Sequence, residues 1–176
     1  HASCRAAFQA ETSESFKRHM RLAAEAYNRA AEHWEKAKKR TSGDCCKALA
    51  IWVNYWIAPS YSEKKKLLAS CRASWRNIAT AYKEIGDRSG YGKACNGLLE
   101  CLSHSILIAP EEWNEAEDML NEGIHFGESA ISSLSEAGED YELAIAYIRT
   151  SLIYIFGSGL MYSPARKELV KKTLVY

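Results

Sequence analysis

Breaks between helical patterns recur along this chain at nearly constant intervals. The chain has only three prolines, and each lies between two stretches of helical periodicity, 51 and 54 residues apart: Pro59, Pro110 and Pro164. Alternating with the prolines are three glycines followed by acidic residues, at Gly43–Asp44, Gly86–Asp87 and Gly138–Asp140. Glycine suits the left-handed position that ends a helix, and an acidic side chain suits the cap of the next one. The spacing predicts a two-helix unit that repeats about every 43 to 54 residues, as in helical solenoids.

Apolar residues recur at spacings of three and four along almost the whole chain, and the period-two alternation of strands is absent. The pattern therefore predicts an all-α fold. The first apolar stripe, expected to face a core on a helix reaching about residue 40, comprises Leu22, Ala26, Ala30, Trp34 and Ala37. The last long stripe, expected to do the same, comprises Tyr141, Ala144, Ile145, Ile148, Leu152 and Ile155.

Local signals support this division into helices. Ser60 and Glu63 have the spacing of a capping box, and Ser163–Pro164 has the form of a helix start. Gly123 and Gly127 fall on the apolar stripe of one helix, where each costs about 1 kcal/mol relative to alanine. We expect a neighbouring helix to approach closely there.

The turns resemble those of the tetratricopeptide-repeat superfamily, over roughly residues 20 to 157. The resemblance rests on Tyr82–Ser89 with Gly92–Leu99, on Glu136–Ala146 and on Ser42–Ala50. The repeats are longer than the usual length of about 34 residues. They are more similar to the elongated repeats of regulatory ATPases and of the soluble attachment proteins of membrane fusion.

The resemblance implies a TPR-like α-solenoid, a right-handed stack of about three antiparallel helical hairpins with a further helix at each end. It also implies that the first helix of each hairpin lines a concave groove that holds a partner. These first helices are expected to begin at about Asp44, Ser89 and Asp140. Their polar residues are the predicted partner-binding groove: Lys47, Asn54, Lys93, Asn96, Glu100 and Arg149.

The composition is that of a globular protein: 176 residues, 47% of them hydrophobic and 26% charged. We expect one domain over residues 1–176, either complete or part of a longer protein, because a helical pattern reaches both ends. The six cysteines fall mostly at apolar helical positions, which favours buried free thiols in the cytoplasm over three disulfides. The two longest uncharged stretches, 48–62 and 150–165, each contain a proline and are shorter than a membrane span of about 20 residues.

Motifs for chemistry are missing from the sequence. There is no His-Glu-x-x-His or Cys-x-x-Cys pair for zinc, and no phosphate-binding loop, nucleophile elbow or dinucleotide fingerprint. Acidic pairs such as Glu139–Asp140 fall at helix starts, where the helix dipole favours them. We therefore predict no enzyme activity, no cofactor and no metal. The five tryptophans fit hairpin cores, with Trp56 and Trp113 as the alternatives for anchoring a ligand.

Charge is divided unevenly along the chain. Residues 1–93 carry 18 Lys and Arg against nine Asp and Glu, whereas residues 94–176 carry five against 13. The predicted basic patch comprises Lys64, Lys65, Lys66, Arg72 and Arg76. One interpretation is a solvated outer face on each helix. The other is recognition of charge-matched partners, or self-association through opposite charged ends, with Glu115, Glu117 and Asp118 at the acidic one.

The sequence therefore predicts a protein-interaction scaffold or regulatory module that binds a partner protein or peptide on a helical-repeat surface. The alternative is a nucleic-acid-associated regulator that uses the basic first half. The alternative is disfavoured because the sequence lacks the interleaved basic and aromatic pattern of single-strand binding surfaces.

Overall fold

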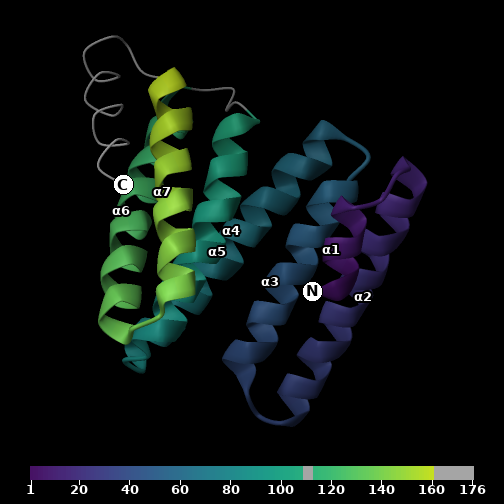
Figure 1. Ribbon diagram of the computed structural model, residues 1–176, viewed down its shortest axis with the longest axis horizontal. Helices are drawn as coiled ribbons and strands as arrows, with labels where there is room; N and C mark the ends of the chain where they lie inside the picture. The colour runs from purple at the N-terminus through teal and green to yellow at the C-terminus, as the bar shows by residue number, and fades with distance from the viewer. Residues whose placement is uncertain (109–112, 161–176) are drawn as a thin grey trace. The chain divides into compact units, whose positions relative to one another are not determined.

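The computed structural model describes residues 1–108 and 113–160, apart from the side chains of residues 113, 114, 159 and 160. These parts of the chain form helices and contain no strand, which confirms the all-α prediction (Figure 1). The helices are α1 (Ala2–Phe8), α2 (Ser13–Lys36), α3 (Arg40–Ile57), α4 (Tyr61–Glu84), α5 (Arg88–Leu107), α6 (Trp113–Ala137) and α7 (Asp140–Leu160). The chain divides into two compact units, His1–Ser74 and Trp75–Tyr176, and the boundary falls within α4.

Two of the three predicted glycine turns are present. Gly86 has a φ of 73° and Gly138 a φ of 69°, the left-handed conformation expected after the ends of α4 and α6. Asp87 then caps α5, because its carboxylate accepts a 2.8 Å hydrogen bond from the Gly90 N–H. Local residue chemistry therefore sets these two helix boundaries.

The third predicted turn, at Gly43, is wrong. Gly43 lies inside α3, and the left-handed residue between α2 and α3 is Lys38, with a φ of 58°. The turn closes through hydrogen bonds from the Lys38 N–H to the Glu35 carbonyl and from the Lys39 N–H to the Trp34 carbonyl, both 2.9 Å long. These bonds satisfy the end of α2 and offset the cost of about 1–2 kcal/mol for a left-handed residue with a side chain.

The start of α4 follows the predicted cap. Ser60 Oγ accepts a 3.2 Å hydrogen bond from the Glu63 N–H, and the Ser60 hydroxyl also reaches the Glu63 carboxylate at 3.3 Å. Pro59 lies between α3 and α4. Pro110 and the segment that begins at Ser163 are outside the described residues.

In the first unit, α2 and α3 form a hairpin, and α1 packs against α2. The core contains Met20 and Tyr27 of α2 together with Val53 of α3, and aromatic rings of α3 extend it. Trp56 is half-buried there, with its ring 5.4 Å from that of Phe8. The first part of α4 joins this core through Cys71, whose Sγ lies 3.5 Å from the Ala48 carbonyl oxygen.

The predicted apolar stripe of α2 is not its buried face. Leu22 and Trp34 are 44% and 38% exposed, whereas Met20, Tyr27 and Ala31 are buried. Because α2 contains alanines on several sides, more than one face of the helix looks apolar in the sequence. The face that packs against the core is the one that carries the two large side chains Met20 and Tyr27.

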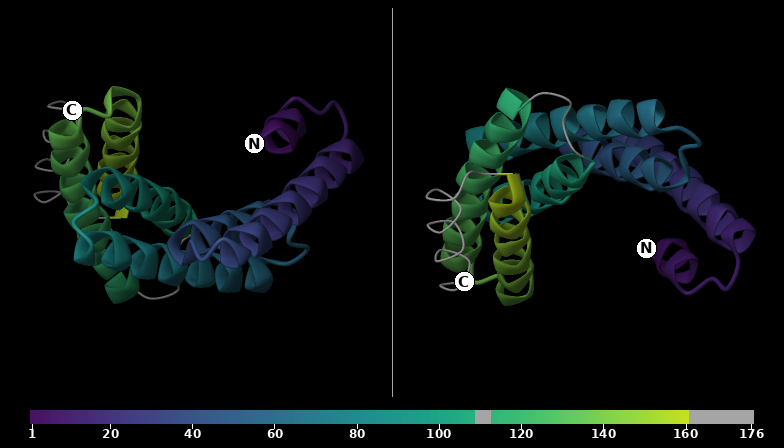
Figure 2. Two further views of the ribbon diagram at one scale, coloured as in Figure 1. Left: turned by 90° about the horizontal axis from the view of Figure 1, so that it is seen from below. Right: turned by 90° about the horizontal axis from the view of Figure 1, so that it is seen from above.

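In the second unit, α5 packs against both α6 and α7, and α6 and α7 form a hairpin that all views show side by side (Figure 2). Glycines of α6 let α7 approach closely, as predicted. A Cβ atom on Gly127 would lie 2.5 Å from Thr150 Oγ1, and one on Gly123 would lie 2.8 Å from Ile153 Cγ2. Side chains of α7 therefore occupy the space that these glycines leave open.

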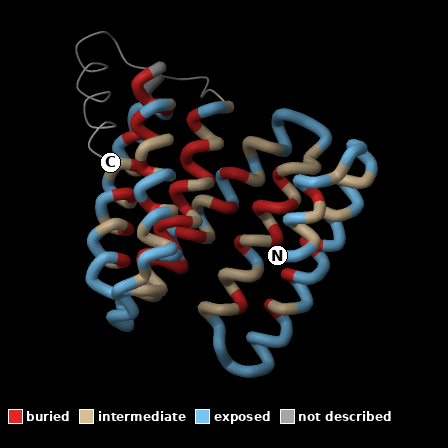
Figure 3. The backbone as a smooth tube through the Cα atoms, viewed as in Figure 1, coloured by how far each residue is buried: buried red, intermediate tan, exposed pale blue. Residues whose placement is uncertain are grey.

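The predicted stripe of α7 is also wrong, and here the error concerns large side chains. Tyr141, Ile148 and Ile155 are 74%, 62% and 48% exposed. The buried face of α7 instead contains Thr150 and Ile153, the residues that meet the α6 glycines. As Figure 3 shows, α7 alternates between buried and exposed segments along its length. Close contact with the glycines selects the face of α7 that packs, and Tyr141, Ile148 and Ile155 point outward.

All six cysteines are free thiols: Cys71, Cys95 and Cys101 are buried, and Cys4, Cys45 and Cys46 are half-buried. Burial raises the pKa of Cys95 to about 12, so that its reactive thiolate form is strongly disfavoured. In the described ranges, no helix has the length and apolar character needed to cross a membrane.

Candidate functional site

Four of the six predicted groove residues come together between α5 and α7. Lys93, Asn96 and Glu100 follow one face of α5 at spacings of three and four, and Arg149 reaches them from α7. We call these four residues, with Glu139 and Glu142 at the start of α7, the α5–α7 seam. The other two predicted groove residues, Lys47 and Asn54, lie on α3 in the first unit.

Arg149 joins the middle of the seam. Its guanidinium donates 2.8 Å and 2.5 Å hydrogen bonds to the Asn96 carbonyl oxygen and to Glu100 Oε2. Burial raises the pKa of Glu100, and the positive charge of Arg149 partly opposes that shift. His104 lies one turn after Glu100 on α5. Burial, and to a lesser extent the Arg149 charge, lowers the pKa of His104.

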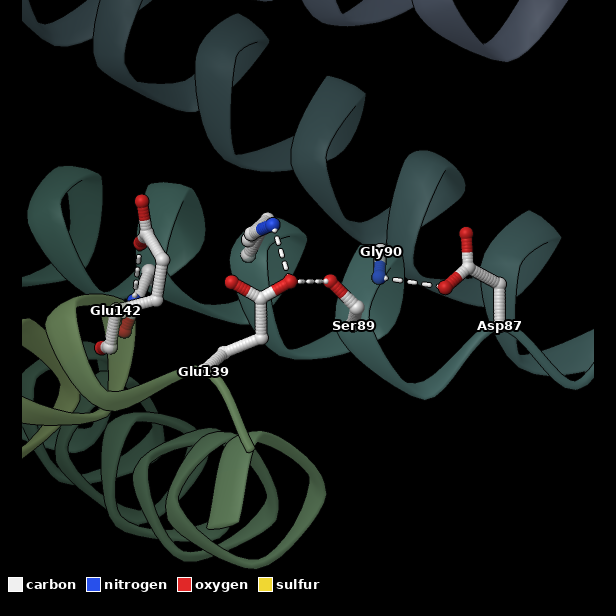
Figure 4. Close-up of polar contacts among 7 residues, drawn as sticks. Asp87, Ser89, Gly90, Glu139 and Glu142 are labelled. Atoms are coloured by element: carbon white, nitrogen blue, oxygen red, sulfur yellow. Dashed lines mark hydrogen bonds and ion pairs between the residues drawn. The ribbon is translucent and has the colours of Figure 1, made fainter. Parts of the chain in front are cut away.

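The start of α7 is attached to α5 by two carboxylates (Figure 4). Glu139 accepts hydrogen bonds from Ser89 Oγ at 2.5 Å and Lys93 Nζ at 2.7 Å, and these bonds lower the pKa of Glu139. Asn96 Nδ2 donates to both the backbone carbonyl and the Oε2 of Glu142, each at 3.0 Å. Asn96 is only 1% exposed, and among the described residues its Oδ1 has no hydrogen-bond partner.

The seam uses its charges within the chain. Lys93 is paired with Glu139, and Arg149 with Glu100. Each cation thus already has a carboxylate partner within the chain. The arrangement therefore fixes α7 against α5.

Three of the five residues of the predicted basic patch likewise contact neighbouring side chains. Lys64 Nζ lies 5.7 Å from the centre of the Tyr55 ring, and Lys65 Nζ lies the same distance from that of Tyr61. Arg76, in the second unit, forms a two-point ion pair with Glu122, with Nη2 2.6 Å from Oε2. Of the remaining two members, Lys66 is exposed and Arg72 is half-buried.

Comparison of the chain with protein-family models, with curated proteins and with solved structures found no match. Within the described residues, no group of three His, Cys, Asp or Glu side chains is placed to hold a metal ion. The side chain of Trp113, one of the two predicted ligand anchors, is outside the described residues.

The sequence interpretation assigned the apolar stripe of α7 to a core, whereas most of its residues lie on the outward face of the helix. This face, which we call the α7 outer face, comprises Tyr141, Ala144, Ile148, Leu152 and Ile155; Leu152 is half-buried and the others are exposed. From Leu143 to Leu160 the only charged residue of α7 is Arg149, which the seam holds. The sequence of α7 indicates an additional apolar face, because large apolar residues lie on every side of the helix. Such a helix needs a neighbour on every side.

Proposed function

We propose that this chain is a protein-interaction module and that the α7 outer face is its binding surface for another protein. One observation carries the proposal: Tyr141, Ile148 and Ile155 are about half to three-quarters exposed on one uncharged helix face. Isolated apolar residues on a surface need no explanation, but a continuous apolar stripe rimmed by polar residues marks an interaction site.

The dimensions of the α7 outer face suit a helix-binding surface. Tyr141 and Ile155 are 14 residues apart, which corresponds to about 21 Å along a helix. Apolar side chains at spacings of three and four make the ridge that a second helix packs against. The seam holds α7 in place before any partner arrives, so binding would involve little loss of conformational freedom.

The finer architecture that we propose is a TPR-like repeat. Its support is the packing of α7 on both the preceding helix α6 and the helix before that, α5. In a solenoid each repeat packs against its neighbours in the sequence. Burial of three of the six free thiols is in keeping with a scaffold that works in the reducing cytoplasm.

Site-specific photo-cross-linking in the full chain tests this function. A photoreactive amino acid at position 148 should give a protein adduct of discrete mass in cells. The same group at Asn121, an exposed position on α6, serves as the control. If the yield of protein adduct at position 148 does not exceed the yield at position 121, the α7 outer face does not have a binding role.

A further inference from the structure

We propose that the partner of the α7 outer face is a second copy of this chain, with the two α7 helices packed antiparallel about a two-fold axis at Ile148. This inference rests on the proposed function, because it names the protein that the face binds. It requires that the face complement itself in shape, in apolar character and in charge.

The stripe is symmetric about Ile148. Tyr141 and Ile155 lie seven residues on either side of Ile148, and Ala144 and Leu152 lie four residues on either side. In a two-fold interface, if residue i of one copy contacts residue j of the partner, then residue j of the first copy contacts residue i of the partner. Antiparallel pairing therefore places Tyr141 against Ile155 of the partner, Ala144 against Leu152 of the partner, and Ile148 against Ile148.

The pairs also match in size. The smallest side chain of the stripe, Ala144, would meet Leu152, and the most exposed aromatic ring, that of Tyr141, would meet the branched Ile155. Alternation of small and large side chains across two helices lets the facing ridges interlock. An antiparallel pair built in this way places two identical large side chains opposite each other only at the axis, where two Ile148 side chains meet.

Charge favours a copy of this chain over a basic or acidic helix. The carboxylates of α7, Asp140 and Glu142, are both in its first turn, and Glu142 is bonded to Asn96 of α5. Its one cation, Arg149, is bonded to Glu100. The stripe beyond Tyr141 thus offers no exposed charge for an oppositely charged partner to pair with, whereas an uncharged apolar face matches it.

Charge also sets the direction of the pair. A parallel arrangement would place Asp140 of one copy beside Asp140 of the other, and like charges in contact oppose association. In the antiparallel arrangement Asp140 faces the second half of the partner's α7, which has no charged residue from Thr150 to Leu160. The helix dipoles are then also antiparallel, which is the favourable orientation for neighbouring helices.

One pair of helices makes a small interface. Specific interfaces of this kind belong to the lower end of the size range, which is typical of weak or transient association. We therefore expect a dimer that dissociates in the micromolar concentration range.

The test uses sedimentation velocity of the full chain over a range of concentrations. Wild-type protein should shift from monomer to dimer as concentration rises. Ile148→Glu and Ile148→Lys should each weaken self-association by about tenfold or more, because two like charges would meet at the axis. An equimolar mixture of the two variants should dimerise again, because the new carboxylate of one copy would then face the new ammonium group of the other.

A matched control distinguishes this pairing from general loss of surface hydrophobicity. Ile85 is 71% exposed at the turn after α4, so Ile85→Glu should leave self-association unchanged. Circular dichroism should show that all three variants keep the helical content of the wild type, because the replaced side chains are exposed.

Three results would overturn the inference. They are a wild-type chain that stays monomeric at all concentrations, dimerisation that survives Ile148→Glu, and charge variants that fail to associate when mixed. If position 148 nevertheless cross-links to a different protein, the interaction module stands and the second copy is excluded. If position 148 instead cross-links only to residues 161–176 of the same chain, the proposed function is overturned as well.

Discussion

At the scale of single residues, the Arg149 side chain organises the contact between α5 and α7. It bonds to a backbone carbonyl and a carboxylate of α5, and its side chain is 23% exposed. Glu100, its partner, is 35% exposed in its side chain, so solvent screens part of their attraction. The pair therefore contributes mainly by satisfying charges that would otherwise be partly buried without a partner.

His104 makes the stability of this region depend on pH. The fold lowers the pKa of His104 below its ordinary value of 6.5, so near pH 6 the unfolded chain binds more protons than the folded one. The contribution of His104 to the free energy of unfolding is fully present above pH 6.5, and it is lost as pH falls toward the pKa of His104 in the folded chain. We expect the free energy of unfolding, measured with urea, to fall between about pH 7.5 and pH 5.5 less steeply in His104→Gln than in the wild type.

The control for this measurement is His125→Gln, which changes an exposed histidine on α6. It should retain the pH dependence of the wild type. Glu100 has a raised pKa, so its own contribution to the free energy of unfolding changes with pH in the opposite direction. The informative quantity is therefore the difference in slope, free energy of unfolding against pH, between each variant and the wild type. Equal slopes for His104→Gln and the wild type would contradict the role assigned to His104.

At the scale of elements, glycines determine how α6 and α7 meet. Thr150 and Ile153 fill the spaces beside Gly127 and Gly123, and this contact turns the α7 outer face away from α6. The same contact leaves Thr150 Oγ1 buried without a hydrogen-bond partner among the described residues. Close packing of the helices outweighs the cost of that unsatisfied hydroxyl.

Substitutions at this contact should be strongly coupled. Gly127→Ala should lower the free energy of unfolding by about 1–3 kcal/mol, because the added Cβ would lie 2.5 Å from Thr150 Oγ1. Thr150→Ala removes the clashing atoms, so the double variant should recover most of that loss. Urea denaturation of the four proteins measures the coupling.

Gly43→Ala is the matched control, because Gly43 is also inside a helix but its Cβ would lie no closer than 3.4 Å to any neighbour. This change should stabilise the chain by about 0.5–1 kcal/mol through helix propensity. Additive effects of Gly127→Ala and Thr150→Ala would show that the two residues are not in close contact.

Helix boundaries could be predicted better than helix faces. Gly86, Asp87 and Ser60 act through local backbone chemistry, which short stretches of sequence specify. Lys38 escaped prediction because a lysine in the left-handed conformation has no sequence signature. Which face of α7 packs depends on Gly123 and Gly127, which precede α7 on α6, and the stripe pattern within α7 does not contain that information.

The site was predictable to a similar extent. Lys93, Asn96, Glu100 and Arg149 were identified as polar residues of equivalent helices, and the structure brings them together. Which residues form ion pairs was not predictable, because Lys93 and Glu139 are 46 positions apart and Glu100 and Arg149 are 49 apart. Each pair comes into contact only through the packing of α5 on α7 and the turn before it.

At the scale of the whole molecule, the charge division follows the two units. Residues 1–74 carry 14 Lys and Arg against seven Asp and Glu, whereas residues 75–176 carry nine against 15. Within the second unit, cations from α4 and α5 form ion pairs with acidic residues of α6 and of the turn before α7: Arg76 with Glu122, Arg88 with Glu136, and Lys93 with Glu139. Part of the asymmetry seen in the sequence therefore serves contacts inside this unit, and self-association need not depend on it.

The orientation of α7 underlies every proposal made for this molecule, and a pair of isoleucines on that helix tests it. Ile148 is 62% exposed and Ile153 is fully buried, so Ile148→Asp and Ile153→Asp introduce the same charge on opposite faces. We predict that Ile153→Asp lowers the free energy of unfolding by about 3 kcal/mol or more, because it buries a carboxylate. Ile148→Asp, measured at a concentration where the monomer predominates, should change it by less than about 1 kcal/mol. Equal destabilisation by the two substitutions would show that Ile148 belongs to the core, and the α7 outer face would not exist.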